Sequence, residues 1–146
     1  MNSAKTLHQF NIITDEIDSL YHKAAGKMGL SDSEMLILYL LVDYEENISQ
    51  SDIIAISGMS KQTVNSAVTN MEKKNWLKRA VKSGRKRSLE LTETGRAIVD
   101  KLIIPFQKME ESIFDSWSME DRSLFVELNI RYRDALKDIV NRMSDR

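Results

Sequence analysis

Residues 60–92 read SKQTVNSAVTNMEKKNWLKRAVKSGRKRSLELT, a sequence that predicts an amphipathic helix followed by a basic hairpin with a glycine at its turn. This stretch carries nine lysines and arginines against two glutamates, a net charge of +7, whereas the whole chain is −1. The remaining residues therefore carry −8. Such segregation gives one region a positive potential that a polyanion such as duplex DNA would meet favourably. A lysine-rich solvated surface is the commoner origin of a charge run, so the neighbouring helices decide between the two.

The residues just before this stretch predict a helix-turn-helix. Ser49 is placed to cap a short helix, SDIIAIS, that ends at Gly58, the residue type best suited to the left-handed conformation that closes a helix. Met59 alone separates Gly58 from Ser60, which is placed to cap the next helix. A short helix, a tight glycine turn and a second capped helix are typical of this motif.

The second helix is predicted to read base edges. Val64, Val68 and Met71 recur at helical spacing and should face the core. The outward positions hold mostly short or amide-bearing side chains, the types that can enter a major groove: Lys61, Gln62, Asn65, Ser66 and Thr69. An idle solvent-exposed face is the alternative, although such a face more often carries Glu and Lys. The flanking residues expected to contact the DNA backbone are Ser60, Thr63 and Lys73.

The segments LKRAVKS and KRSLELT flank Ser83-Gly84-Arg85 and predict a hairpin, or wing, beyond this helix. Arg85 is the candidate for the minor groove, where narrow A·T tracts favour an inserted guanidinium. Lys86 and Arg87 are expected to contact phosphates, which fixes position but carries little sequence information.

Helices are expected on both sides of this region. An apolar stripe predicts a helix over about residues 5–25 that stops near Gly26. The pair Ser31 and Glu34 forms a capping-box pattern, and the run MLILYLLVDY behind it is apolar on every side, as in a fully buried helix. Thr92 is placed to cap a long helix, which Pro105 should bend or divide near Ile104.

The last helix, after Ser118, carries a near-heptad seam at Phe125, Leu128, Tyr132, Ala135, Ile139 and Arg142. Such a seam could pack on the first helix of the same chain. The terminal helices nevertheless offer more apolar surface than one core of this size can cover, so the sequence favours a second subunit.

Composition excludes several classes of protein. The 146 residues are 42% hydrophobic, enough for one core without disulfides or metal, and the absence of cysteine excludes a thiolate zinc site and a thiol redox switch. Because no apolar run approaches the length of a membrane span and the first 20 residues lack the apolar region of a signal peptide, we expect a soluble, cytoplasmic protein.

We expect no catalysis, no cofactor and no metal. The only histidines, His8 and His22, lie 14 positions apart, so they lack the adjacency of a two-histidine site. No metal-binding, phosphate-binding or nucleophile motif is present, and carboxylate pairs such as Glu45-Glu46 point to different helix faces.

The chain resembles the MarR family of bacterial winged-helix repressors along most of its length. SKQTVNSAVTNMEKKNWLKR is similar to the family's recognition helix and its exit, and RKRSLELTETG to its wing and the "LT..G" entry into the next helix. Aligned on Leu91-Thr92, Arg85 falls on the family's wing arginine. Ser83 replaces the aspartate that commonly braces this arginine, and Asn75 replaces a usual glycine, whose left-handed conformation asparagine tolerates.

The resemblance implies a mainly α fold with a small β-hairpin wing, a single MarR-like domain. Residues 32–92 would form the winged helix-turn-helix, and residues 1–30 and 93–146 the dimerisation helices. It further implies a homodimeric repressor that binds a pseudo-palindrome in double-stranded DNA and is released by a small apolar or aromatic effector, such as a carboxylate. Position suggests an effector pocket lined by Tyr21, His22, Met28, Met35, Tyr39 and Trp76. A winged-helix architectural or protein-interaction subunit remains the alternative, which a footprint on a defined palindrome would distinguish.

Overall fold

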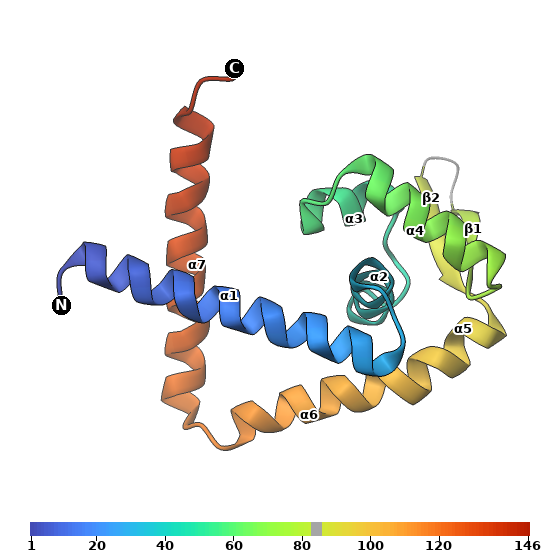
Figure 1. Cartoon of the computed structure of the whole chain (residues 1–146), viewed down its shortest axis with the longest axis horizontal. Coiled ribbons are helices and arrows are strands. Elements are labelled where there is room, and N and C mark those ends of the chain that lie inside the picture. The colour runs from blue at the N-terminus through green and yellow to red at the C-terminus, as the bar shows by residue number, and fades with distance from the viewer. Residues whose placement is uncertain (83–85) are drawn as a thin grey trace. The chain divides into compact units, whose positions relative to one another are not determined.

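The computed structural model describes the backbone of residues 1–82 and 86–146 and the side chains of residues 1–80 and 88–146. It is mainly helical with one two-stranded antiparallel sheet, which confirms the predicted fold class (Figure 1). The chain forms two compact units, Met1–Pro105 and Phe106–Arg146. The functional division into residues 1–30, 32–92 and 93–146 stays a prediction. The helices of the first unit begin with α1 (Ser3–Met28), α2 (Asp32–Asp43), α3 (Gln50–Ser57) and α4 (Lys61–Lys73).

Helix α2 is the core of the first unit. The predicted capping box is present: Ser31 Oγ accepts the Glu34 N–H at 3.1 Å, and the Glu34 side chain accepts the Ser31 N–H at 3.0 Å. Ile37, Leu38 and Leu41 are completely buried. Figure 1 shows α2 nearly end-on, and it contacts α1, α4 and the hairpin, as expected of a helix that is apolar on every side.

The predicted helix-turn-helix is confirmed. Ser49 caps α3 and forms a reciprocal capping box with Asp52, while Gly58 closes the helix with φ 69°. Ser60 then caps α4 by accepting the Thr63 N–H at 3.1 Å. Because Gly58 adopts a left-handed conformation at little cost, the chain turns within two residues and α4 packs directly on α3.

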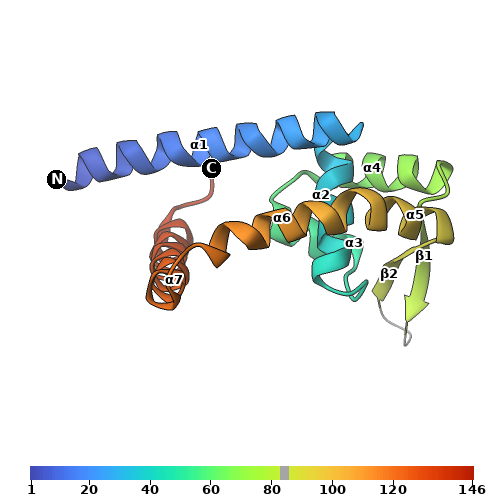
Figure 2. The same cartoon turned by 90° about the horizontal axis from the view of Figure 1, so that it is seen from below.

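The predicted hairpin is also confirmed and extends away from α5 (Figure 2). Strand β1 (Leu77–Lys82) pairs with β2 (Lys86–Leu91), with Leu77 opposite Leu91 and Lys82 opposite Lys86. The Leu89 N–H also donates to the Ile48 carbonyl at 3.2 Å, so the loop before α3 holds the base of the hairpin.

Helix α1 runs three residues beyond the predicted end, because Gly26 stays helical. The left-handed residue is Gly29, with φ 73°, and its N–H bonds to the carbonyls of Ala25 and Gly26. Glycine permits a helix end without imposing one, so the continuing backbone hydrogen bonds carry α1 past Gly26.

The long helix after Thr92 is divided as predicted, into α5 (Glu93–Ile98), the π-helical turn η1 (Val99–Ile103) and α6 (Ile104–Asp115). The Ile104 N–H bonds to the Val99 carbonyl, five residues back rather than four. The wider turn lies directly before Pro105, whose ring crowds the preceding turn and which has no N–H to donate.

The second unit contains most of α6 and the long helix α7 (Met119–Arg142), which follows Ser118 as predicted; the Ser118 side chain caps it. The rings of Phe114, Trp117 and Phe125 pack together with centroids 5.1 to 5.8 Å apart. Every residue of α7 except Arg122 is exposed in the single chain. Within the described residues, no helix has the length and apolar character of a membrane span.

Candidate nucleic-acid interface

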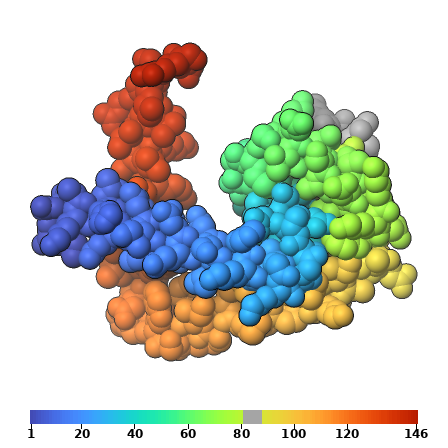
Figure 3. Space-filling view, viewed as in Figure 1, coloured from blue at the N-terminus to red at the C-terminus, as the bar shows by residue number. Residues whose placement is uncertain are grey.

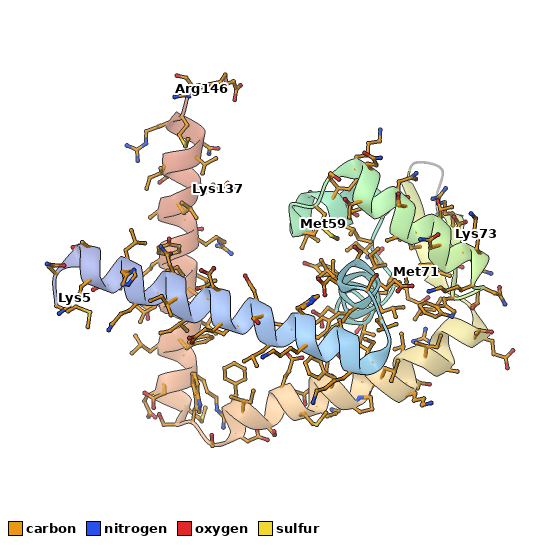
Figure 4. All side chains as sticks on the ribbon, in the orientation of Figure 1. Lys5, Met59, Met71, Lys73, Lys137 and Arg146 are labelled. Carbon is orange, nitrogen blue, oxygen red and sulfur yellow. The ribbon has the colours of Figure 1, made fainter. Side chains whose placement is uncertain are left out.

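Helix α4 has one buried face and one exposed polar face. Val64, Val68 and Met71 are 0% exposed and Ala67 is 7% exposed, which confirms that this side packs on the core. Figure 4 labels Met71 on the side of α4 toward α2 and Lys73 on the outer side. Burial stabilises the fold by roughly 1.5 to 3 kcal/mol for each large apolar side chain. The buried face therefore fixes the rotation of α4 about its axis. The rotation then determines which side chains point outward.

The five predicted base-reading residues lie together on the outer face. Lys61, Gln62, Asn65 and Ser66 are exposed, and Thr69 is half-buried. The predicted backbone contacts Ser60, Thr63 and Lys73 are also exposed and stand at the two ends of the helix. The Ser60 and Thr63 hydroxyls are 2.8 Å apart, so the first turn presents two linked hydroxyl groups.

A polar groove borders this face on the side of α2. Its volume is about 440 Å³. Its lining includes Ser31, which precedes α2, and Ser33 of α2. It also includes Gln62 and Ser66 of α4 and Lys74, which follows α4. Gln62 and Ser66 therefore stand toward the start of α2, and the outer face of α4 continues into a surface of hydroxyl and amide groups.

Asn65 stands toward α3 instead, where a residue that sequence reasoning missed contacts it. Gln50, the first residue of α3, donates from Nε2 to Asn65 Oδ1 over 3.3 Å. This bond engages the Asn65 oxygen and does not use the Asn65 NH₂ group, which carries two N–H donors. The sequence predicted only that Ser49 caps this helix; the packing of α3 on α4 brings the two amides together.

An ion pair joins the start of α2 to the end of α4. Glu34 is 7% exposed, and its Oε2 accepts from Lys74 Nζ at 2.7 Å. Burial alone raises the pKa of Glu34, but hydrogen bonds from Lys74 and Ser31 outweigh it and leave the pKa below its ordinary value. Lys74 also lies 4.5 Å from the centre of the Trp76 ring. One carboxylate thus closes the start of α2 and holds the end of α4.

The hairpin lies beside α4, and the two meet at one region of the surface in Figure 3. Two of its cations are partly neutralised, because Arg79 Nη2 is 3.3 Å from Glu72 Oε1 and Lys78 Nζ is 3.8 Å from Glu90 Oε2. Of the predicted wing contacts, Lys86 and Arg87 belong to β2 and pair in register with Lys82 and Val81. Arg85 lies outside the described residues.

The junction between α4 and α5 shows why the "LT..G" pattern contains glycine. Asn75 has φ 59°, which confirms the left-handed conformation expected of it. The Thr92 N–H donates to the Trp76 carbonyl at 3.0 Å, and Gly95 lies so close that an added Cβ would be 1.8 Å from this oxygen. Glycine is therefore required at this close approach of two backbones, although its own φ is not left-handed.

A second pocket lies between α1 and α2 and has a volume of about 440 Å³. Four of the six predicted effector residues line it, namely Tyr21, His22, Met35 and Tyr39. The other lining residues, which sequence reasoning missed, are Asp18, Asp32 and Leu36. Met28 and Trp76 are not part of this lining: Met28 ends α1, and Trp76 precedes β1. His22 Nδ1 lies 2.9 Å from both carboxylate oxygens of Asp32.

No cluster of three histidine, aspartate or glutamate side chains suited to a metal ion occurs in the part of the chain that the structure describes.

Comparison with known proteins finds similar sequences and structures. Residues 28–88 match the sequence model of the MarR family. The HTH-type transcriptional repressor YetL of Bacillus subtilis is 25% identical over 126 residues, covering 84% of this chain and 71% of YetL. NMB1585, a MarR family regulator from Neisseria meningitidis, has a similar structure with a TM-score of 0.77 and 25% identity, covering 98% of this chain and 100% of that one. MepR of Staphylococcus aureus in its DNA-binding conformation aligns with a TM-score of 0.75 and 19% identity, covering 90% and 98%.

Proposed function

Because this chain is a DNA-binding transcription regulator of the MarR family, we propose that it acts as a homodimeric repressor of a pseudo-palindromic operator. The observation that carries the proposal is the two-sided helix α4. Its inner face is buried, while its outer face presents hydroxyl, amide and ammonium groups beside a basic hairpin. One such helix per subunit suits a site with two half-sites about one helical turn apart.

Base reading is assigned to the outer face of α4. Asn65 and Gln62 can donate and accept at base edges in the major groove, and each good contact discriminates by about 1 to 3 kcal/mol. Lys61, Ser66 and Thr69 complete this reading set. Ser60, Thr63 and Lys73 are assigned to phosphates at the two ends of the helix, where they set register.

The wing is assigned to the flanking DNA. Arg85 would enter the minor groove, and Lys86 and Arg87 would contact phosphates. The ion pairs of Lys78 and Arg79 favour this assignment, because those two cations are already engaged by glutamates of the same unit. We therefore assign the electrostatic attraction of the wing to Lys86 and Arg87, which stand nearer the turn in the sequence.

Dimerisation is supported by apolar side chains that the single chain leaves exposed in each unit. On α1 these include Leu7, Phe10, Ile13, Ile17 and Leu20, between 38% and 62% exposed. On α7 they include Phe125, Leu128, Tyr132 and Ile139, between 44% and 54% exposed. Apolar surface on this scale marks an interface in a folded chain. Since each unit carries one such surface, we assign both terminal helices to the contact with a second copy.

The test combines selection of operator sequences from random DNA with sedimentation of the free protein. We expect symmetric selected sites, a dimer at micromolar concentration, and a Kd that rises steeply with salt. Asn65→Ala should relax the preference at one base pair of each half-site, whereas Lys86→Ala should weaken binding to all sequences about equally. A monomer that selects only asymmetric sites would refute the dimeric repressor. Salt-dependent binding without any selected sequence would favour the architectural module instead.

We further assign the pocket between α1 and α2 to a small-molecule effector. Such an effector would bind better to an arrangement of the two recognition helices that cannot contact the operator. By linkage, it must bind more weakly when operator is present. It should therefore release operator and raise the melting temperature of the free protein, increasingly with ligand concentration.

A further inference from the structure

We propose that the pocket between α1 and α2 selects a hydrophobic organic cation, a lipophilic amine or quaternary ammonium compound, rather than the aromatic carboxylate that the family resemblance suggests. The regulatory meaning of this inference rests on the proposed function. The binding chemistry itself follows from the lining of the pocket alone.

The lining combines negative charge with aromatic and apolar surface. Asp18 stands on α1, and Asp32 is the first residue of α2. Tyr21 and Tyr39 line the same pocket, from α1 and α2 respectively. Met35 and Leu36 supply most of the remaining lining, and both come from α2. The lining therefore combines two carboxylates, two aromatic side chains and two apolar side chains.

Positive charge is scarce in the same lining. No lysine or arginine contributes to it, among the residues that the structure describes. The one lining residue able to carry positive charge is His22, and its Nδ1 is 2.9 Å from both oxygens of Asp32. An entering carboxylate would meet two like charges and lose hydration without a guanidinium or ammonium partner to replace it.

A cation meets the opposite situation. A carboxylate within a few ångströms of an ammonium group stabilises it. The faces of Tyr21 and Tyr39 add attraction to a quaternary ammonium through the ring quadrupole, and its alkyl groups would pack on Met35. Charge and ring chemistry thus agree on one class of ligand.

The pocket also joins two elements of the first unit. Its lining comes from α1 and α2, and the His22–Asp32 contact crosses between them at the start of α2. A cation that draws Asp32 toward itself would compete with His22 for that carboxylate. Because Glu34 ties the start of α2 to the end of α4, a shift there would reach the recognition helix through one ion pair.

The experiment uses the full-length protein without DNA and three probes: phenyltrimethylammonium, its neutral isostere tert-butylbenzene, and benzoate. Binding is measured by calorimetry and by thermal shift. We expect the cation to bind at least about tenfold more tightly than the isostere, and benzoate not to bind in this pocket. Asp18→Asn should weaken the cation by about threefold or more. Asp15→Asn is the matched control, since it removes the same charge from an exposed position of α1 outside the lining.

The outcomes separate this inference from the proposed function. Benzoate binding as tightly as the cation, equal effects of the two aspartate variants, or no binding of any probe would each overturn the cation assignment. Operator binding is measured separately in the absence of every probe. If the protein selects its operator but fails the probe test, only the cation assignment falls; if it binds the cation but no operator, the regulator fails and the ligand class stands.

Discussion

Gly95→Ala should destabilise the protein far more than the addition of one methyl group suggests. Gly95 is buried in α5, and the new Cβ would lie 1.8 Å from the Trp76 oxygen and 2.7 Å from its carbonyl carbon. Because Cβ atoms essentially never approach closer than 3.0 Å, the two backbones must separate by at least about 1.2 Å. That movement would stretch the 3.0 Å hydrogen bond from the Thr92 N–H to the same oxygen.

The expected loss follows from these two effects. Overpacking a closely packed site costs about 1 to 3 kcal/mol, and a lost backbone hydrogen bond adds about 1 kcal/mol. We therefore expect the free energy of unfolding to fall by about 2 to 4 kcal/mol. Urea unfolding followed by circular dichroism, at one fixed protein concentration, measures this quantity.

Gly26→Ala provides the matched control, because Gly26 also lies inside a helix but a Cβ there would have no atom within 4 Å. The better helix propensity of alanine should raise the free energy of unfolding by about 0.5 to 1 kcal/mol. The same substitution would then have opposite signs at the two sites. Our account of the α4–α5 junction is refuted if Gly95→Ala stays within about 0.5 kcal/mol of the unsubstituted protein, or if Gly26→Ala is equally damaging.

Three further substitutions test other contacts. Glu34→Gln keeps an acceptor for the capping box but removes the charge that holds Lys74, so it should cost about 1 kcal/mol near neutral pH. Folding lowers the pKa of Glu34, so the difference in free energy of unfolding between the two proteins should be present above the ordinary glutamate pKa of about 4.3. It should disappear as the pH falls below that value. A difference that persists in acid would contradict the ion-pair explanation. Gln50→Ala should relax the base preference at the same base pair as Asn65→Ala. The double variant should lose little more selectivity for the operator than either single variant. Additive losses at different base pairs would show that Gln50 does not orient Asn65. Glu45→Gly should raise the melting temperature slightly, because Glu45 is exposed and its φ of 51° is a left-handed conformation that favours glycine. An unchanged or lower melting temperature would show that the Glu45 side chain compensates for this backbone conformation.

The helices and their ends were largely predictable because the signals are local. Ser31, Ser49, Ser60 and Thr92 each precede a helix as its cap, and a cap depends only on residues within one turn. Gly26 shows the limit of this reasoning, since a glycine permits a helix end but the competing hydrogen bonds decide it. The buried face of α4 was predictable for the same reason, as helical spacing fixes which residues share a side.

Contacts between distant residues were not predictable. Glu34 and Lys74 lie 40 positions apart, and Gln50 and Asn65 lie 15 apart, so no periodic pattern links either pair. No sequence pattern marks Asp18, which lines the pocket because α1 packs against α2. The proposed effector is therefore a hydrophobic cation rather than an aromatic carboxylate, because its chemistry depends on which charges meet at one pocket.

The two-sided construction of α4 has a consequence for how operators diverge. The side chains that hold the helix in place, Val64, Val68 and Met71, make no part of the proposed reading surface, and exposed Gln62 and Ser66 contribute nothing to the buried core. Substitutions at such exposed positions usually change folding free energy by less than about 0.5 kcal/mol. Recognition can therefore change residue by residue while the scaffold keeps its stability, so a duplicated gene could acquire a new binding site without first passing through an unfolded intermediate. Asn65 is the exception, because altering it also leaves Gln50 without its partner.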